Sequence, residues 1–129
     1  MEANEIYLNE LKEIHKAMKK EIDEMNASLV KKEDEYAEFG AKILRTELEL
    51  KGIKAGVTIV EYFGDKGIVR LKKRDRYFGV SPYYQYAFVK IKKNGLLSAR
   101  SEIIFMIEDY LKRGTLKITN EEYNKEELA

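Results

Sequence analysis

An apolar repeat every seven residues runs from Leu8 to Ile53 and limits the fold of this chain more than any other feature. Two positions of each heptad are apolar, and polar residues interrupt them at His15, Lys32 and Thr46. We call these positions the heptad seam; they are Leu8, Leu11, His15, Met18, Ile22, Met25, Leu29, Lys32, Tyr36, Phe39, Ile43, Thr46, Leu50 and Ile53. A seam of this period is typical of a helix that packs against another helix as a coiled coil.

Two geometries fit the heptad seam. One is a single helix of about 45 residues, roughly 70 Å long, which stops at Gly52. The other is a helical hairpin that turns near Asn26 and Ser28. Neither helix buries its seam alone. We therefore expect a homodimer or a higher homo-oligomer, or docking of the helix onto the rest of the chain.

The pattern changes after Gly52. Residues 55–95 are rich in β-branched and aromatic side chains that alternate with polar ones between glycine-containing turns. One turn is expected at residues 64–67 and another at Asn94-Gly95. This pattern predicts an antiparallel meander of at least three strands.

Residues 98–113 are ambiguous. As a helix, the segment would begin at Ser98 or Ser101 and end at Gly114. As strands, it would pair back across the turn at Asn94-Gly95. We favour the helix.

The expected fold is therefore α+β. A long N-terminal helix or helical hairpin precedes a small antiparallel β-rich core with one helix, and residues 115–119 form its last strand. We divide the chain into a helical oligomerisation region (1–52), a ligand-binding core (53–120) and a polar tail (121–129).

Charge is segregated in this chain, although its net charge is only +1. Residues 1–52 carry a net charge of −4, whereas residues 66–100 hold ten Lys and Arg residues and one acid, Asp75. Such a concentration of cations indicates an anionic partner. The alternative is that this segment packs against the acidic helices of its own chain or of a second copy.

Several classes of protein are not expected. The 129 residues suit one domain, with no cysteine, no apolar run of about 18 residues and no signal-peptide pattern at the start. We therefore expect a cytoplasmic protein that binds no membrane. His15 is the only histidine, and we interpret it as a polar interruption of the seam. Without a metal-ligand cluster, a phosphate-binding loop or an activated nucleophile, we expect no enzyme activity, no metal and no cofactor.

The strand predicted over residues 84–92 has one face that would suit a nucleotide. Alternation places three rings and two ammonium groups on this face, for bases to stack on and phosphates to bind. These residues are Tyr84, Tyr86, Phe88, Lys90 and Lys92. Arg70 and Lys72 on the preceding strand can add cations. The alternative is that the rings form the core and the small residues of the other face point outward.

The loop between these two strands is a second candidate. Arg74 and Arg76 could hold phosphates, and Tyr77 or Phe78 could cover a base. The alternative is an ordinary exposed connection. Arg100, near the expected helix N-terminus, is a further phosphate candidate. The complete set of candidate ligand-binding residues is Arg70, Arg74, Arg76, Tyr77, Phe78, Tyr84, Tyr86, Phe88, Lys90, Lys92, Asn94 and Arg100.

Three functions fit these features. The first is non-catalytic binding of a small phosphate-bearing nucleotide by a homodimer or a larger assembly. The second is nucleic-acid binding, because residues 53–73 look like a small SH3-like or KOW-like basic module. The third is a structural or protein-interaction role for the coiled coil.

The size of the chain, with N-terminal helices ahead of a β-rich core, resembles the phage-encoded anti-Thoeris sponge proteins. The resemblance covers the whole chain as an order of elements and matches no diagnostic motif, so it assigns no residues. It implies a protein that sequesters a cyclic nucleotide signal, such as a cyclic ADP-ribose isomer, between the protomers of a dimer without cleaving it. It also implies a counter-defence role in the cytoplasm of a bacterial host. The resemblance makes the first function our leading hypothesis.

Overall fold

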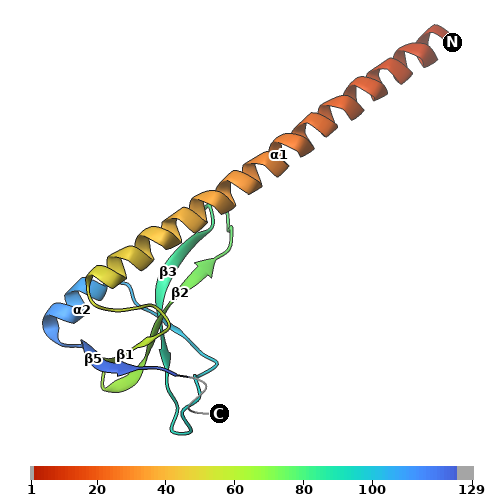
Figure 1. Ribbon diagram of the computed structural model, residues 1–129. Coiled ribbons are helices and arrows are strands. Elements are labelled where there is room, and N and C mark those ends of the chain that lie inside the picture. Colours follow the sequence, from red (N-terminus) through yellow and green to blue (C-terminus); the bar gives the residue numbers. More distant parts are fainter. Residues whose placement is uncertain (1, 125–129) are drawn as a thin grey trace. The chain divides into compact units, whose positions relative to one another are not determined.

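The computed structural model describes residues 2–124 and has the expected α+β fold (Figure 1). Its elements, in chain order, are α1 (Glu2–Leu50), β1 (Thr58–Tyr62), β2 (Asp65–Arg74), β3 (Tyr83–Lys90), β4 (Glu102–Ile103), α2 (Ile107–Arg113) and β5 (Leu116–Glu122). The tail predicted over residues 121–129 begins inside β5, and residues 125–129 lie outside the described part of the chain.

The N-terminal region is one helix, so the helical hairpin is wrong. α1 is continuous through Asn26 and Ser28 and ends at Leu50. The Gly52 amide donates to the carbonyl of Glu49 at 2.9 Å and closes the helix, as its glycine predicted. Ile53, the last expected seam position, lies beyond the helix and is buried in the core.

The chain divides into two compact units, Met1–Glu35 and Tyr36–Ala129. In the first unit, residues 2–32 are helical and every side chain is exposed. The second unit holds the last part of α1, the sheet and α2, together with the buried core. The functional division expected between residues 52 and 53 stays a prediction.

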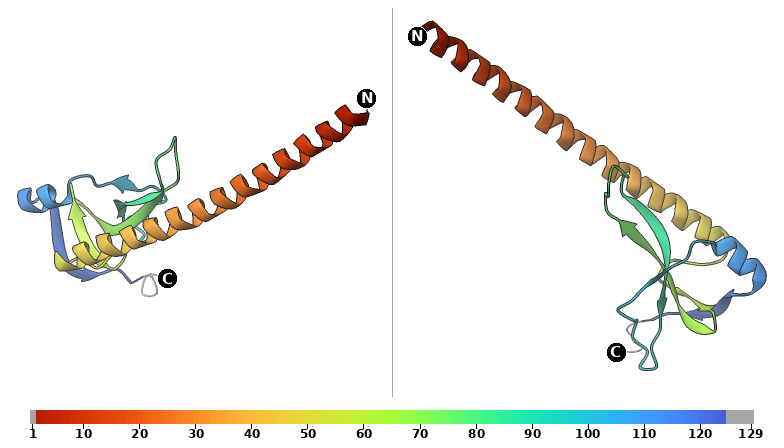
Figure 2. Two further views of the ribbon diagram at one scale, coloured as in Figure 1. Left: turned by 90° about the horizontal axis from the view of Figure 1, so that it is seen from above. Right: turned by 180° about the vertical axis from the view of Figure 1, so that it is seen from behind.

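The strands form one antiparallel sheet in the order β4-β3-β2-β1-β5. β1, β2 and β3 are the predicted meander, and Figure 2 shows β2 and β3 as a long twisted hairpin. β5 is the expected last strand and returns to pair with β1. The register of this last pair shifts between Thr58 and Val60.

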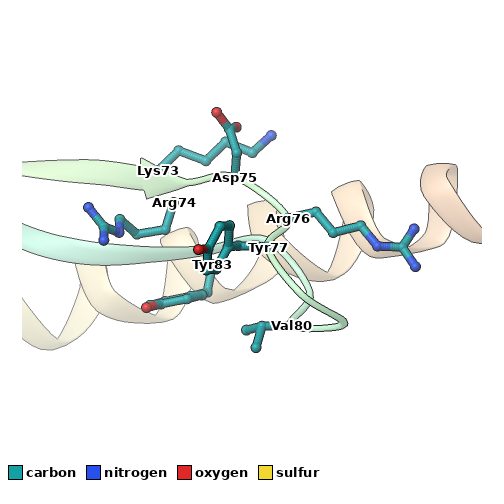
Figure 3. A pocket seen from close by; sticks show the side chains of 7 residues that line it. All are labelled: Lys73, Arg74, Asp75, Arg76, Tyr77, Val80 and Tyr83. Carbon is teal, nitrogen blue, oxygen red and sulfur yellow. The ribbon is translucent and has the colours of Figure 1, made fainter.

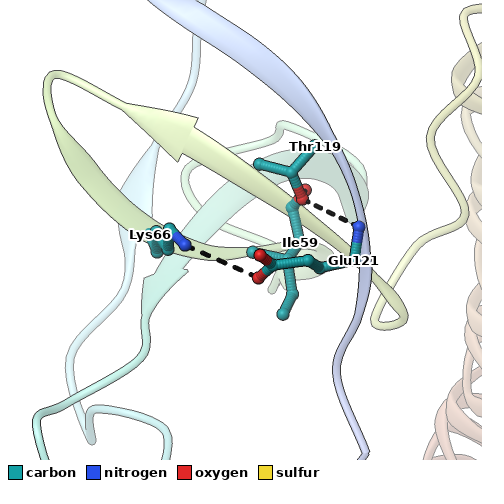
Figure 4. Close-up of polar contacts among 4 residues, drawn as sticks. All are labelled: Ile59, Lys66, Thr119 and Glu121. Atoms are coloured by element: carbon teal, nitrogen blue, oxygen red, sulfur yellow. Dashed lines mark hydrogen bonds and ion pairs between the residues drawn. The ribbon is translucent and has the colours of Figure 1, made fainter.

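Side chains support the pairing of β1 and β5 where the register shifts. The Thr119 hydroxyl donates to the carbonyl of Ile59 at 2.6 Å, so this backbone acceptor keeps a partner. The same hydroxyl accepts a bond from the Glu121 amide, and Lys66 Nζ lies 3.5 Å from the Glu121 carboxylate (Figure 4).

The ambiguous segment 98–113 contains both kinds of element. Its middle forms β4 beside β3, and only its last seven residues form α2. The expected N-terminal caps, Ser98 and Ser101, are wrong, because α2 begins after Met106, whose side chain makes no cap bond. Ser101 instead accepts a hydrogen bond from Lys72 Nζ at 3.2 Å. Gly114 ends the helix in the left-handed conformation, as predicted.

The main core lies between one face of the sheet and the two helices. Its buried residues come from α1, from β1, β2, β3 and β5, from α2, and from the segments just after α1 and β4. They are Leu48, Ile53, Val60, Tyr62, Val69, Tyr86, Phe88, Ile104, Ile107 and Leu116. The other face of the sheet is buried near its centre as well, at Ile59, Ile68, Ala87 and Val89. Both faces of the central strands are therefore apolar and covered.

The last part of α1 has two different apolar sides. The buried side contributes Ala37, Ala41, Leu44 and Leu48. The heptad seam of the same segment is exposed at Tyr36, Phe39, Ile43 and Leu50. At about 100° per residue, Phe39 and Ala41 lie roughly 160° apart around the helix. The side that packs in the second unit is therefore not the side that the heptad pattern identifies.

Candidate functional site

The register of β2 and β3 decides which side chains share a face. Arg70 pairs with Ala87, Lys72 with Gln85 and Arg74 with Tyr83. Directly opposed residues point to the same side of an antiparallel pair. The three cations, which we call the cation row (Arg70, Lys72 and Arg74), therefore lie on the face that carries Ala87 and Gln85. The predicted alternation of Tyr84, Tyr86, Phe88 and Lys90 on one face holds, but Arg70 and Lys72 lie on the opposite face and add no cations to these rings.

The rings of β3 face α1 and the core. The Tyr86 hydroxyl donates to the carbonyl of Leu44 at 2.7 Å, and the Tyr84 hydroxyl donates to Glu38 Oε1 at 2.5 Å. Phe88 is only 5% exposed and lies 5.0 Å from the ring of Tyr62. Tyr86 and Phe88 are core residues, and their assignment as a base-stacking platform was wrong. The alternative that the rings form the core is confirmed for these two.

Burial also sets the protonation of Tyr86. Loss of solvent, with smaller contributions from the charges of Glu47 and Glu108, raises the pKa of its hydroxyl to about 12. The hydroxyl therefore stays protonated, and keeps its bond to Leu44, at pH values where an exposed tyrosine would already ionise. This is a structural role.

The other predicted residues of β3 and the following turn lie at the far end of the hairpin. Lys90 is seven strand positions from the Arg74–Tyr83 pair, which is about 23 Å at 3.3 Å per residue. Its ammonium lies 3.4 Å from the carboxylate of Asp65. Lys92 and Asn94 follow in a tight turn, where the Asn94 side chain accepts a bond from the Leu96 amide. These three residues do not join the loop residues in one site.

Arg100 is also separate from a helix N-terminus. α2 begins at Ile107, and the Arg100 amide donates to Ser98 Oγ in the loop before β4. The expectation that Arg100 supports phosphate binding at a helix end is therefore wrong. Its side chain is exposed.

The loop between β2 and β3 is a continuation of the hairpin with a tight tip. Tyr77 and Val80 pair through both of their backbone groups, at 3.2 and 2.9 Å. Phe78 and Gly79 between them have φ angles of 42° and 76°. Positive values at both central residues are the mark of a type I′ turn.

Aromatic side chains are exposed at this tip. Tyr77 is 70% and Phe78 is 87% exposed, and their rings meet edge to face at 4.4 Å. Val80 and Tyr83 are exposed as well. We call the exposed pair Tyr77 and Phe78 the hairpin tip. The structure therefore brings together four of the predicted residues, Arg74, Arg76, Tyr77 and Phe78.

A recess of about 440 Å³ lies beside the hairpin tip. Its lining residues are Lys73, Arg74, Asp75, Arg76, Tyr77, Val80 and Tyr83 (Figure 3). The two tyrosine rings are drawn between the guanidinium groups of Arg74 and Arg76, which point to opposite sides of the loop. The cations are therefore spread along the surface and do not converge on one point.

The sequence analysis did not identify Tyr83 as a residue of this site, and it did not identify the tight turn at Phe78 and Gly79. Tyr83 is in register with Arg74, and counting back from the paired strands would have placed it on the cation face. The turn had a clearer signal, because the tripeptide Tyr-Phe-Gly occurs twice, at residues 62–64 and 77–79. Both copies form the same kind of turn, with Phe63 at φ 49° and Gly64 at φ 85° in the first.

Within residues 2–124, no group of three or more His, Asp or Glu side chains is arranged to hold a metal ion. Over the same residues, no helix combines the length and the apolar character that crossing a membrane requires.

Comparison with known proteins gives no match. No protein-family model matches the chain, and no significant match is found among curated proteins or among solved structures. The resemblance to the sponge proteins and the expected lack of enzyme activity therefore stay predictions.

Proposed function

We propose that this protein binds nucleic acid through the cation row and the hairpin tip, without chemical change to the ligand. The observation that carries the proposal is the arrangement of Arg70, Lys72 and Arg74 along one face of the β2–β3 hairpin, which ends in exposed aromatic rings. Phosphates bind to such cations and bases stack on such rings.

The charge of the cation row supports an external anion. Among residues 2–124, the guanidinium groups of Arg70 and Arg74 have no ion-pair partner. Leu44 of α1 packs on the opposite, ring-bearing side of the hairpin, where its carbonyl accepts a hydrogen bond from Tyr86, so this part of the helix does not neutralise the row. Uncompensated cations on one face raise the local concentration of polyanions.

The spacing of the cations favours a polymer. Arg70 and Arg74 are four strand positions apart, about 13 Å, and the guanidinium groups of Arg74 and Arg76 diverge (Figure 3). A compact nucleotide needs cations that converge on one or two phosphates. A chain of phosphates can meet them one after another.

We also propose that α1 pairs with α1 of a second copy. Seam residues are exposed in both units, for example Leu29 in the first and Ile43 in the second, and those of the second unit lie away from the buried side of the helix. A seam with a 3.5-residue period fits a partner helix of the same period, which a second copy supplies. The pair would carry two hairpins and bind one polymer with higher avidity than a single hairpin.

Leu29→Asp tests this pairing by light scattering. We expect the mass of the dimer to fall to that of the monomer, because a charge would enter the seam. Ala27→Asp adds the same charge outside the seam and should leave the mass unchanged. Equal masses for the two variants would contradict pairing at this position.

Fluorescence anisotropy with labelled 20-nucleotide DNA and RNA tests the proposed function. Arg70→Ala/Arg74→Ala should weaken binding and lower the slope of log Kd against log salt by roughly 1.4, because each single-strand phosphate contact contributes about 0.7. Lys16→Ala/Lys20→Ala removes the same charge from α1 and is the control. If both double variants weaken binding equally, the hairpin is not the binding surface.

A compact nucleotide is the second candidate ligand. The recess beside the hairpin tip supports it, since about 440 Å³ lies within the usual range of roughly 300–1,000 Å³ for ligand pockets. In this case the protein would be a sponge for a cyclic nucleotide such as a cyclic ADP-ribose isomer. A thermal-shift series with cyclic nucleotides and ADP-ribose isomers should then stabilise the protein strongly with one compound. Mass spectrometry after denaturation should recover that compound intact.

A further inference from the structure

We infer that the hairpin tip stacks on unpaired bases and makes this protein selective for single-stranded over double-stranded nucleic acid. This inference rests on the proposed function. It adds which form of nucleic acid is bound and which two residues, Tyr77 and Phe78, select it.

The backbone at Phe78 is the first observation. Its φ of 42° is in the left-handed region, which bulky side chains rarely occupy and which costs about 1–2 kcal/mol outside glycine. A type I′ turn prefers Asn, Asp or Gly at this position. Phenylalanine is therefore an unfavourable choice for the turn itself.

The surroundings of Phe78 do not offset this cost. Its only ring neighbour among the described residues is Tyr77, which is itself exposed, and the side chain is 87% exposed. By contrast, Phe63 has the same strained conformation but lies 4.6 Å from the ring of Tyr62 and 5.8 Å from that of Tyr110. Phe63 is itself 65% exposed, so these two ring contacts offset its strain only in part, whereas Phe78 contacts no buried ring within residues 2–124. Strain without packing is typical of functional residues.

The position of the hairpin tip suggests the ligand. Arg74 and Arg76 flank it, so a phosphate backbone bound by these cations would bring bases to the two rings. In a duplex, both faces of each base are covered by its neighbours, and a protruding ring has nothing to stack on. In a single strand, the bases can turn outward onto Tyr77 or Phe78.

The test compares a single strand with its duplex for the wild type and for Phe78→Asn. Asparagine suits a type I′ turn, so the hairpin should keep its shape. We expect affinity for the single strand to fall roughly 5- to 100-fold, as for the loss of one stacked base, while duplex affinity and the salt slope stay unchanged. Phe105→Asn removes another exposed ring, which is 77% exposed, and should change neither affinity.

Phe78→Trp gives an independent readout. The chain has no tryptophan, so this variant has a single indole at the tip. Stacking should quench its fluorescence when a single strand is added and leave it unchanged with the duplex.

The outcomes separate this inference from the proposed function. If the wild type binds both forms and Phe78→Asn weakens neither, or both equally, the tip does not select single strands and only this inference fails. If no nucleic acid binds, both proposals fail. Fluorescence that changes with vesicles of anionic phospholipid and not with oligonucleotides would assign the tip to a membrane surface and overturn the inference.

Discussion

The two Tyr-Phe-Gly turns have the same sequence and nearly the same backbone, but their tyrosines have opposite surroundings. Phe63 and Phe78 have φ angles of 49° and 42°, and in each turn the Tyr and Phe rings meet at steep angles, with centroids 4.6 and 4.4 Å apart. Yet Tyr62 is 4% exposed, whereas Tyr77 is 70% exposed. Three residues are enough to make the turn, and they do not determine whether it is buried.

Neighbouring elements account for the difference. Tyr62 ends β1, which lies between β2 and β5, and its ring meets Phe88 and Tyr110. Tyr77 lies beyond the last pair of the β2–β3 ladder. The first turn is therefore anchored in the core through Tyr62, although Phe63 and Gly64 at its tip are exposed, while both rings of the second turn are exposed.

Replacing the two tyrosines by alanine should produce the largest contrast. We expect Tyr62→Ala to lower the free energy of unfolding by about 3–5 kcal/mol, because it leaves a cavity among packed rings. Tyr77→Ala should change it by less than about 0.5 kcal/mol. Urea unfolding followed by circular dichroism measures both, and similar losses would mean that the second turn is also buried in solution.

Gly67, just after the first turn, should be nearly as sensitive. A Cβ there would lie 2.3 Å from the carbonyl oxygen of Val89 and 2.5 Å from the ring of Phe88, so the strand or the ring must move. We expect Gly67→Ala to cost about 1–3 kcal/mol in the same measurement. Gly40→Ala is the control, since nothing lies within 4 Å of its added Cβ and alanine favours the helix. A tolerated Gly67→Ala would argue against this close packing.

Alkaline pH should weaken the core that contains the first turn. Burial, with smaller effects of Tyr110 and Glu102, raises the pKa of Tyr62 to about 12, and burial likewise raises that of Tyr86 to about 12. In the unfolded chain both titrate near 10. Stability should therefore be intact below pH 10 and fall as the pH rises from 10 to 12, because only the unfolded state releases these protons.

Thermal melts between pH 8 and 12 measure this loss for the wild type and for Tyr62→Phe. The variant should lose less stability over this interval, since phenylalanine does not titrate. An identical slope in both proteins would show that Tyr62 does not contribute to the pH dependence.

The smallest effects should have opposite signs in the two turns. Phe78→Asn should stabilise the fold by about 0.5–1 kcal/mol, because asparagine accepts a positive φ and no packing is lost. Phe63→Asn relieves the same strain but loses its contacts with the rings of Tyr62 and Tyr110, so it should not stabilise the fold. Chemical denaturation measures the free energy of unfolding of both variants. If Phe78→Asn were less stable than the wild type, the Phe78 ring would make packing contacts within the fold.

Much of the fold could be predicted because local sequence determines it. The heptad seam and the stop at Gly52 led to a long helix or a helical hairpin, and the turn residues led to the β1–β2–β3 meander. The cations and rings of the loop were also found, since a loop between two predicted strands is exposed. Segment 98–113 was only partly predicted, because its two-residue strand depends on pairing with β3 and has little pattern of its own.

The choice of the core face required the tertiary structure. Alternation along β3 separates Tyr86 and Phe88 from Ala87 and Val89, but both sets are apolar, and the sequence cannot say which set a helix will cover. α1 covers the rings with a side built from Ala37, Ala41 and Leu44, whose small residues give no strong apolar signal beside the heptad seam. The sequence by itself therefore determined the elements and their turns. The tertiary structure decided which rings are core and which remain for a ligand, because burial depends on what packs above a face and not on the residues within it.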